Sequence, residues 1–172
     1  MKPRVVLAMR DSVRHQLWRH LLPRSSQLEQ AAFGFAAWES ENHAFRLDSW
    51  YRVPCKGFVV QTEISFELTD EVRAAAIKRA HDLDTSLVEF HSHRLGSVAQ
   101  FSASDLAGFS DFVPHVWWRL KGKPYLAIVV ARGGFDGTAW ISEPSTGLPI
   151  YGIMTNDRLL RAGHSSLQEL LK

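Results

Sequence analysis

The sequence predicts a mixed α/β domain of the α+β kind, in which a mixed β-sheet is flanked by helices. Two observations lead to this expectation. Helical apolar spacing and short β-branched apolar runs follow one another along the chain, which is typical of mixed domains. The chain has 172 residues, 45% of them hydrophobic, which is enough for one core without disulfides. We therefore expect residues 1–172 to form a single domain without internal repeats.

The first half of the chain alternates between strands and amphipathic helices. The patterns predict strands at Val5–Ala8, Ala31–Trp38, Ala44–Val53 and Phe58–Phe66. Asp11 or Ser12 can cap a helix that runs to about Leu22, where Pro23 stops it. Thr69 begins a second helix, with acidic residues in its first turn and basic residues near its end, as the helix dipole favours.

The second half contains the strand and helix on which the functional interpretation rests. Thr85–His93 is predicted as a strand, and Ser102 opens a helix that we expect to end near Pro114. Further elements follow toward the C-terminus: strands at Tyr125–Val130, Thr138–Ser142 and Leu148–Met154, a turn at Gly133-Gly134, and a last short helix at Ser165–Leu171.

Charge and cysteine content exclude several classes of protein. The net charge is +2 and the basic residues are scattered, so neither nucleic acid nor a membrane surface is indicated as a partner. Cys55 is the single cysteine, which excludes a disulfide framework and a Cys-x-x-Cys zinc site. No signal segment and no apolar run long enough to span a bilayer is visible, so we expect a soluble, cytoplasmic protein.

A candidate metal site is formed by His91, His93 and Asp105. The two histidines are two apart on a predicted strand, so both imidazoles project from the same face. Asp105 lies one turn into the next helix, and the intervening loop can fold it back toward the histidines. Two imidazoles and one carboxylate, with a fourth position left for water, form the ligand set of catalytic zinc.

Ser102 lies beside these ligands at the helix start, where its hydroxyl can donate a hydrogen bond to a developing oxyanion. Each half of the pattern also has a simpler interpretation. A His-x-His pair on a strand is often two solvent-facing polar residues, and Ser102-x-x-Asp105 is a helix capping pattern. The capping and metal roles are compatible, because Asp105 can bind a metal while Ser102 caps the helix.

These residues resemble the signature of the JAB/MPN (JAMM) zinc metalloprotease family, whose members include small prokaryotic proteins of the Mov34/MPN/PAD-1 type. The signature is His-(Ser/Thr)-His-Pro, seven residues, Ser, two residues, Asp. His91-Ser92-His93, Ser102 and Asp105 fall in register, and Arg94 stands where proline is usual. The resemblance covers about residues 3–131 and implies an MPN/JAB1-like fold with a curved mixed sheet.

The family also places a catalytic glutamate before an early strand, in a segment that Glu29–Phe35 resembles. Glu29 lies 62 positions before His91, in the expected order, and the resemblance implies that it is the general base. Other acidic residues remain as alternatives: Glu39, Glu41, Glu63 and Glu89, of which Glu89 projects with the histidines. Glu29 could otherwise be an ordinary loop residue.

The resemblance implies a Zn2+-dependent hydrolase of peptide or isopeptide bonds. The substrate would be a ubiquitin-like protein or its conjugate, with activating and conjugating proteins of the same pathway as possible partners, as in antiphage operons of related prokaryotic members. Two alternatives remain open. One is a non-catalytic MPN scaffold that serves as an interaction module, and the other is a peptidase acting on small peptides or sulfur-carrier adducts.

Overall fold

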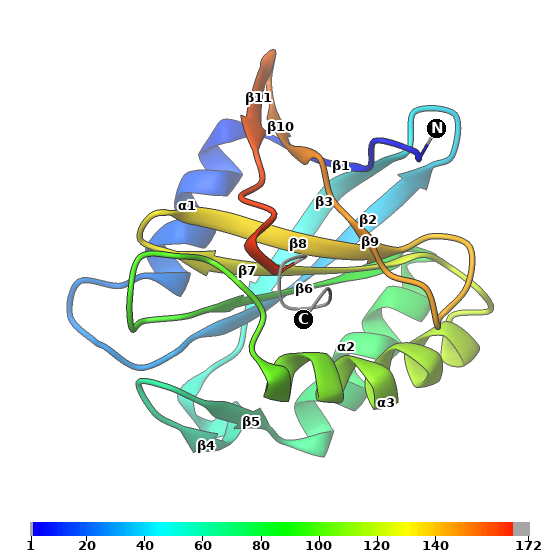
Figure 1. The fold of residues 1–172 in the computed structure, drawn as a ribbon. Coiled ribbons are helices and arrows are strands. Elements are labelled where there is room, and N and C mark those ends of the chain that lie inside the picture. The colour runs from blue at the N-terminus through cyan, green and yellow to red at the C-terminus, as the bar shows by residue number, and fades with distance from the viewer. Residues whose placement is uncertain (1, 167–172) are drawn as a thin grey trace.

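The computed structural model describes residues 2–166, which contain three α-helices, a nine-stranded mixed sheet and a separate two-stranded hairpin (Figure 1). This confirms the expected α+β class. In chain order the elements are β1 (Val6–Met9), α1 (Asp11–Leu21), β2 (Ala31–Glu39), β3 (Ala44–Arg52), the 3-10 turn η1 (Cys55–Gly57), β4 (Phe58–Gln61), β5 (Phe66–Leu68), α2 (Asp70–Asp82), β6 (Ser86–Ser92), α3 (Ala103–Arg119), β7 (Tyr125–Ala131), β8 (Gly134–Trp140), β9 (Leu148–Pro149), β10 (Gly152–Thr155) and β11 (Arg158–Arg161).

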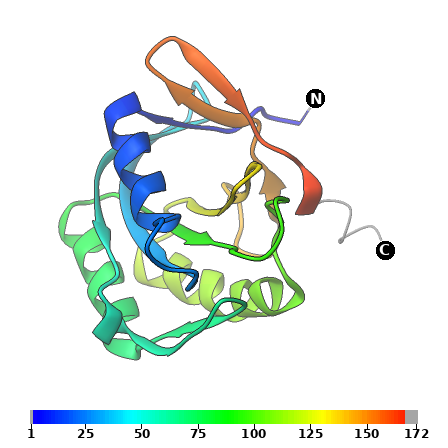
Figure 2. The same cartoon turned by 90° about the vertical axis from the view of Figure 1, so that its left-hand side faces the viewer.

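The large sheet has the strand order β11-β10-β1-β3-β2-β6-β7-β8-β9 and curls around α1 (Figure 2). Strands β2 and β6 are antiparallel, with Ala31 opposite His91. Strands β6 and β7 are parallel, and α3 provides the crossover between them. This central arrangement places the end of β6, the start of β2 and the start of α3 next to one another.

Two apolar layers cover the sheet, one on each face. Helices α2 and α3 and the β4–β5 hairpin pack on one face, and α1 packs on the other. All seven residues of β7 are buried because the strand is covered on both sides. Its side chains alternate between the two layers: Tyr125 and Val129 face the α3 side, whereas Leu126 and Val130 face the α1 side.

The structure corrects several predicted boundaries. The expected strand Phe58–Phe66 is a hairpin, because the Thr62 hydroxyl accepts hydrogen bonds from the backbone of Ile64 and Ser65 and turns the chain. Helix α3 does not end near Pro114 but continues to Arg119. Val113 and Val116, which flank the proline, are both buried in the core, and this packing outweighs the missing backbone donor.

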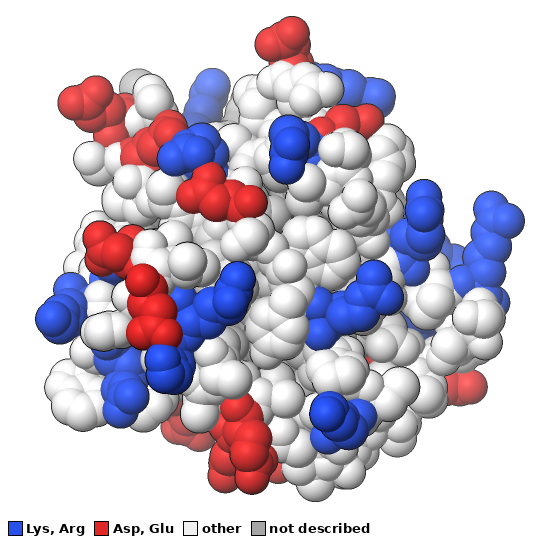
Figure 3. All heavy atoms as spheres, turned by 180° about the vertical axis from the view of Figure 1, so that it is seen from behind, with Lys and Arg blue, Asp and Glu red and all other residues white. Residues whose placement is uncertain are grey.

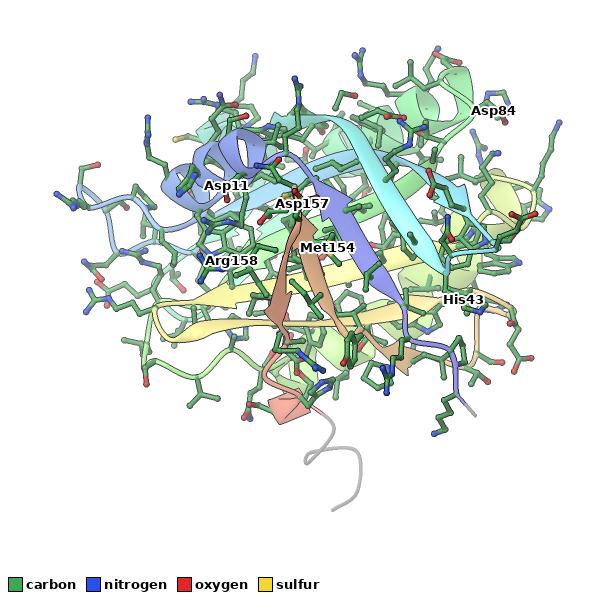
Figure 4. All side chains as sticks on the ribbon, turned by 90° about the horizontal axis from the view of Figure 1, so that it is seen from above. Asp11, His43, Asp84, Met154, Asp157 and Arg158 are labelled. Carbon is green, nitrogen blue, oxygen red and sulfur yellow. The ribbon has the colours of Figure 1, made fainter. Side chains whose placement is uncertain are left out.

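Toward the C-terminus, the predicted strand Leu148–Met154 is divided into β9 and β10, and β8 begins at Gly134 directly after the predicted turn. Strand β11 was not predicted. It pairs with β10 at one edge of the sheet, where Met154 and Arg158 lie in the view from above (Figure 4). The predicted helix Ser165–Leu171 falls mainly outside the described residues.

The surface carries interspersed charges of both signs on the face seen from behind (Figure 3). None of the helices among residues 2–166 has the length and apolar character that a bilayer crossing needs.

Candidate metal centre

Three side chains from two elements converge at the end of β6. His91 is on β6, His93 directly follows that strand, and Asp105 is in the first turn of α3. Possible ligand atoms of the three lie within 4.8 Å of one another. The His91 side chain is 1% exposed, and those of His93 and Asp105 are 17% and 16% exposed. His91 is therefore enclosed by the protein, whereas His93 and Asp105 are partly accessible to solvent.

The distances within this cluster match those of ligands around a tetrahedral ion. Asp105 Oδ2 lies 3.1 Å from His93 Nε2 and 3.4 Å from His91 Nε2. Ligands about 2.1 Å from a tetrahedral zinc ion would lie about 3.4 Å from each other. The three atoms can therefore face one cation with little movement.

The hydrogen bonding of His91 supports a metal ligand and not an ordinary buried histidine. Among the described residues, both ring nitrogens of His91 are buried without a hydrogen-bond partner. The 3.4 Å contact with Asp105 thus lacks hydrogen-bond geometry. A buried imidazole with two unsatisfied nitrogens is costly, and a cation on Nε2 would satisfy one of them. The residues present therefore fit a divalent metal ion.

Asp105 is held in place by the helix that it begins. The Ser102 hydroxyl accepts a hydrogen bond from the Asp105 backbone N–H at 3.1 Å, and Asp105 Oδ2 accepts one from the Ser102 N–H at 2.7 Å. This is the capping box that the spacing predicted. Burial raises the pKa of Asp105, but the two imidazoles lower it more and hold it well below its usual range. The carboxylate is therefore available as an anionic ligand.

Among residues 2–166, the exposed hydroxyl of Ser102 takes part only in the capping bond, as its acceptor, so its own hydrogen can be donated to another group. The capping role and the expected oxyanion role of Ser102 are thus structurally compatible.

Glu29 lies beside the three candidate metal ligands. Its side chain is 4% exposed, and it is close enough to His93, His91 and Asp105 for their charges to act on it. Burial raises the pKa of Glu29 from 4.5 to about 7, which is more than the opposing effect of the histidines. A carboxyl group with a pKa near neutrality is suited to both accepting and donating a proton.

Backbone and amide hydrogen bonds position Glu29. Its N–H donates to the carbonyl of Thr62, and Gln61 Nε2 donates to its carbonyl at 2.8 Å. The next residue, Gln30, donates its N–H to the Ser92 hydroxyl and accepts the Ser92 N–H. The serine of the His-Ser-His segment thus ties the Glu29 segment to the strand that carries the histidines.

The alternative glutamates are less well placed. Glu39 is at the other end of β2, where it pairs with Arg46 at 3.0 Å, and Glu41 and Glu63 are exposed. Glu89 does project with the histidines. Its Oε1 lies 3.8 Å from His91 Nδ1, but its Oε2 accepts a hydrogen bond from the buried Tyr125 hydroxyl at 2.6 Å. Glu89 therefore lies next to the centre, but its carboxylate is hydrogen-bonded to Tyr125.

Arg94 has a role that the sequence did not reveal. Its guanidinium donates hydrogen bonds to the carbonyls of Pro23 and Ser26, at 3.0 and 2.8 Å, and the side chain is buried. Arg94 therefore anchors the loop between α1 and β2, which leads to Glu29. A local sequence pattern cannot predict a contact between residues that are 68 or more positions apart.

Cys55 is exposed and is not part of the cluster.

Comparison with known proteins adds little to this picture. No protein-family model matches the chain, and no curated protein matches it significantly. Among the solved structures that match is a solution structure of a protein from Salinibacter ruber, a structural genomics target. It is 19% identical, with a TM-score of 0.46, and the match covers 94% of this chain and 99% of that protein. At that level of similarity the match bears on neither fold family nor activity.

Proposed function

We propose that the chain is a zinc-dependent peptidase of the MPN/JAMM type. The observation that carries the proposal is the buried His91 imidazole, which has no hydrogen-bond partner and faces Asp105 and His93 at ligand spacing. The element order supports the same family, because a glutamate-bearing segment precedes the histidine strand and a Ser-x-x-Asp helix follows it. His91, His93 and Asp105 would hold the ion.

Each residue around the centre has a separate role in the proposed amide hydrolysis. When bound, zinc supplies Lewis acidity, which lowers the pKa of a coordinated water to about 7 and polarises a carbonyl. Glu29 accepts the proton of the attacking water and later passes it to the leaving amine, and its buried carboxyl group beside the three candidate ligands is placed for both transfers. Ser102 donates a hydrogen bond from its hydroxyl to the oxyanion of the tetrahedral intermediate.

The substrate would be a ubiquitin-like protein or its conjugate, cleaved at the flexible tail of the modifier. The β4–β5 hairpin flanks the centre, since the ring of Phe66 lies 5.4 Å from that of His91. An extended tail could add to a strand edge of this two-stranded hairpin and gain main-chain hydrogen bonds. This substrate class rests on the resemblance to the family.

The test uses zinc-loaded protein and a panel of ubiquitin-like proteins, each fused through its tail to a reporter. We expect cleavage of at least one fusion and its loss in Glu29→Gln. The matched control is Glu63→Gln, which makes the same change on the exposed hairpin turn and should cleave as the wild type does. If the protein binds zinc but cleaves no fusion, the modifier-directed activity is wrong. A chain that binds no zinc would instead fit a non-catalytic scaffold.

A further inference from the structure

A pocket of about 320 Å³ opens directly beside the candidate metal centre. Asp105 forms part of its wall, so whatever enters the pocket lies next to the metal. Strand β5 and the first half of α3 form its two sides, and Phe33 of β2 and Glu89 of β6 lie at its base. The size is at the small end of the range for ligand pockets, which suits one side chain better than a folded surface.

The pocket is lined by apolar rings. Phe33, Phe66, Phe109 and Phe112 contribute from three different elements. Phe66 and Phe112 are only partly buried, so part of their apolar surface faces the open space. Burial of exposed aromatic surface inside a concave site favours the binding of an apolar ligand group.

Three of the four charged residues that line the pocket contact other groups of the protein. Asp105 faces the histidines, and Glu89 accepts the Tyr125 hydroxyl. The Arg73 guanidinium lies 5.2 Å from the centre of the Phe112 ring, in cation–π geometry. Glu67 is exposed at the rim. Beside these polar groups, the four phenylalanine rings form the apolar part of the pocket, and an apolar group that enters would pack on them.

One position on the α3 wall keeps the pocket open. Gly108 lines it, and a Cβ added there would meet nothing within 4 Å. A glycine inside a helix is unfavourable relative to most residues, so this position gains no stability from being small. Its effect is to leave space in front of the rings.

We propose that this pocket receives one bulky apolar side chain, aromatic or large aliphatic, of the residue on one side of the scissile bond. The inference rests on the proposed peptidase function and narrows its substrates. A substrate with only small residues around the cleaved bond would leave the phenylalanine rings uncovered and gain nothing from the pocket. A tail or target residue with a phenyl or leucyl group would bury that surface.

The first experiment measures binding to zinc-loaded protein by calorimetry, with N-acetyl-phenylalanine hydroxamate and N-acetylglycine hydroxamate as probes. The hydroxamate is common to both, so their difference reports the pocket. We expect the phenylalanine compound to bind about 10- to 100-fold more tightly, as burial of one phenyl group allows. Gly108→Met fills the open space and should abolish this preference. Equal affinity of the two probes for the wild type would refute the proposal.

The matched control is Ala107→Met, which places the same side chain on the next residue of α3. Ala107 is exposed and does not line the pocket. We expect this variant to keep the preference for the phenylalanine probe. Loss of the preference in both variants would show that added bulk on α3 acts without filling the pocket, and it would count against the proposal. Thermal melts verify that both variants fold.

A metal-independent measurement separates failure of the pocket from failure of the proposed function. N-acetyl-phenylalaninamide is titrated into metal-free protein and followed by amide NMR shifts. We expect saturable shifts at Gly108 and Phe66 in the wild type, none in Gly108→Met, and none with N-acetylglycinamide. If the shifts occur but the protein binds no zinc, the proposed peptidase function is wrong and the pocket proposal is supported. Zinc binding without these shifts would overturn the pocket alone.

Discussion

Replacing Glu29 with glutamine should stabilise the metal-free protein at neutral pH while it removes activity. The glutamate is 4% exposed, and its pKa is raised from 4.5 to about 7 by burial. The folded protein therefore holds a proton that the unfolded chain has released between these two pH values. Since the native state binds more protons there, the free energy of unfolding falls as pH rises from 4.5 to 7. Glutamine has the same shape and does not ionise, so the variant avoids this loss.

The size of the effect follows from the pKa values. A shift of one pKa unit corresponds to about 1.36 kcal/mol, so moving the pKa from 4.5 to about 7 weakens folding by at most about 3.4 kcal/mol above pH 7. The mouth of the site is open to solvent, which screens part of this, and we expect about 2 kcal/mol. For a chain of this size that corresponds to a rise in Tm of about 4–8 °C.

The assay is urea unfolding of chelator-treated wild type and Glu29→Gln at several pH values between 4.5 and 8. We expect the two proteins to be nearly equal at pH 4.5 and to diverge as pH rises, with the variant more stable. Glu63→Gln, an exposed glutamate on the neighbouring hairpin, should show no such divergence. A stability difference that is constant across this range, or that favours the wild type at pH 8, would refute the assignment of a strained buried carboxylate.

Zinc should reduce the stability that Glu29→Gln gains over the wild type. A cation held by His91, His93 and Asp105 favours the ionised form of the nearby Glu29 and so lowers its pKa. The gain from Glu29→Gln at pH 8 should therefore shrink or disappear in zinc-loaded protein. If the gain is the same with and without zinc, Glu29 does not lie beside the ion.

Three further substitutions test separate parts of the structure. His91→Ala should abolish tight zinc binding, measured as metal content after dialysis, whereas retention of stoichiometric zinc would contradict the ligand assignment. Arg94→Ala removes two hydrogen bonds from a buried guanidinium to the carbonyls of Pro23 and Ser26 and should cost about 2 kcal/mol in urea unfolding; a loss under about 0.5 kcal/mol would show that the loop does not depend on it. Pro114→Ala restores a backbone donor inside α3 at an exposed position and should raise stability by about 1–3 kcal/mol, and an unchanged Tm would mean that the helix tolerates the proline without cost.

Local patterns in the sequence were sufficient for the parts of the site that depend on near neighbours. Alternation along a strand places His91 and His93 on one face, and the Ser102-x-x-Asp105 spacing produces a capping box. The apolar, β-branched run at Tyr125–Val130 predicts a strand, and the structure has β7 there. Each of these features is decided within a few residues, which is why a single sequence contains them.

The tertiary structure decided everything that depends on pairing between distant segments. Glu29 reaches the histidines because β2 and β6 pair with Ala31 opposite His91, a register set by two buried faces of the sheet and not by any local signal. Packing in the core also carried α3 past Pro114, and it left the pocket between β5 and α3 open beside Asp105. The sequence alone identifies the residues that can bind a metal, but only the pairing of β2 with β6 brings Glu29, the proposed proton acceptor, next to them.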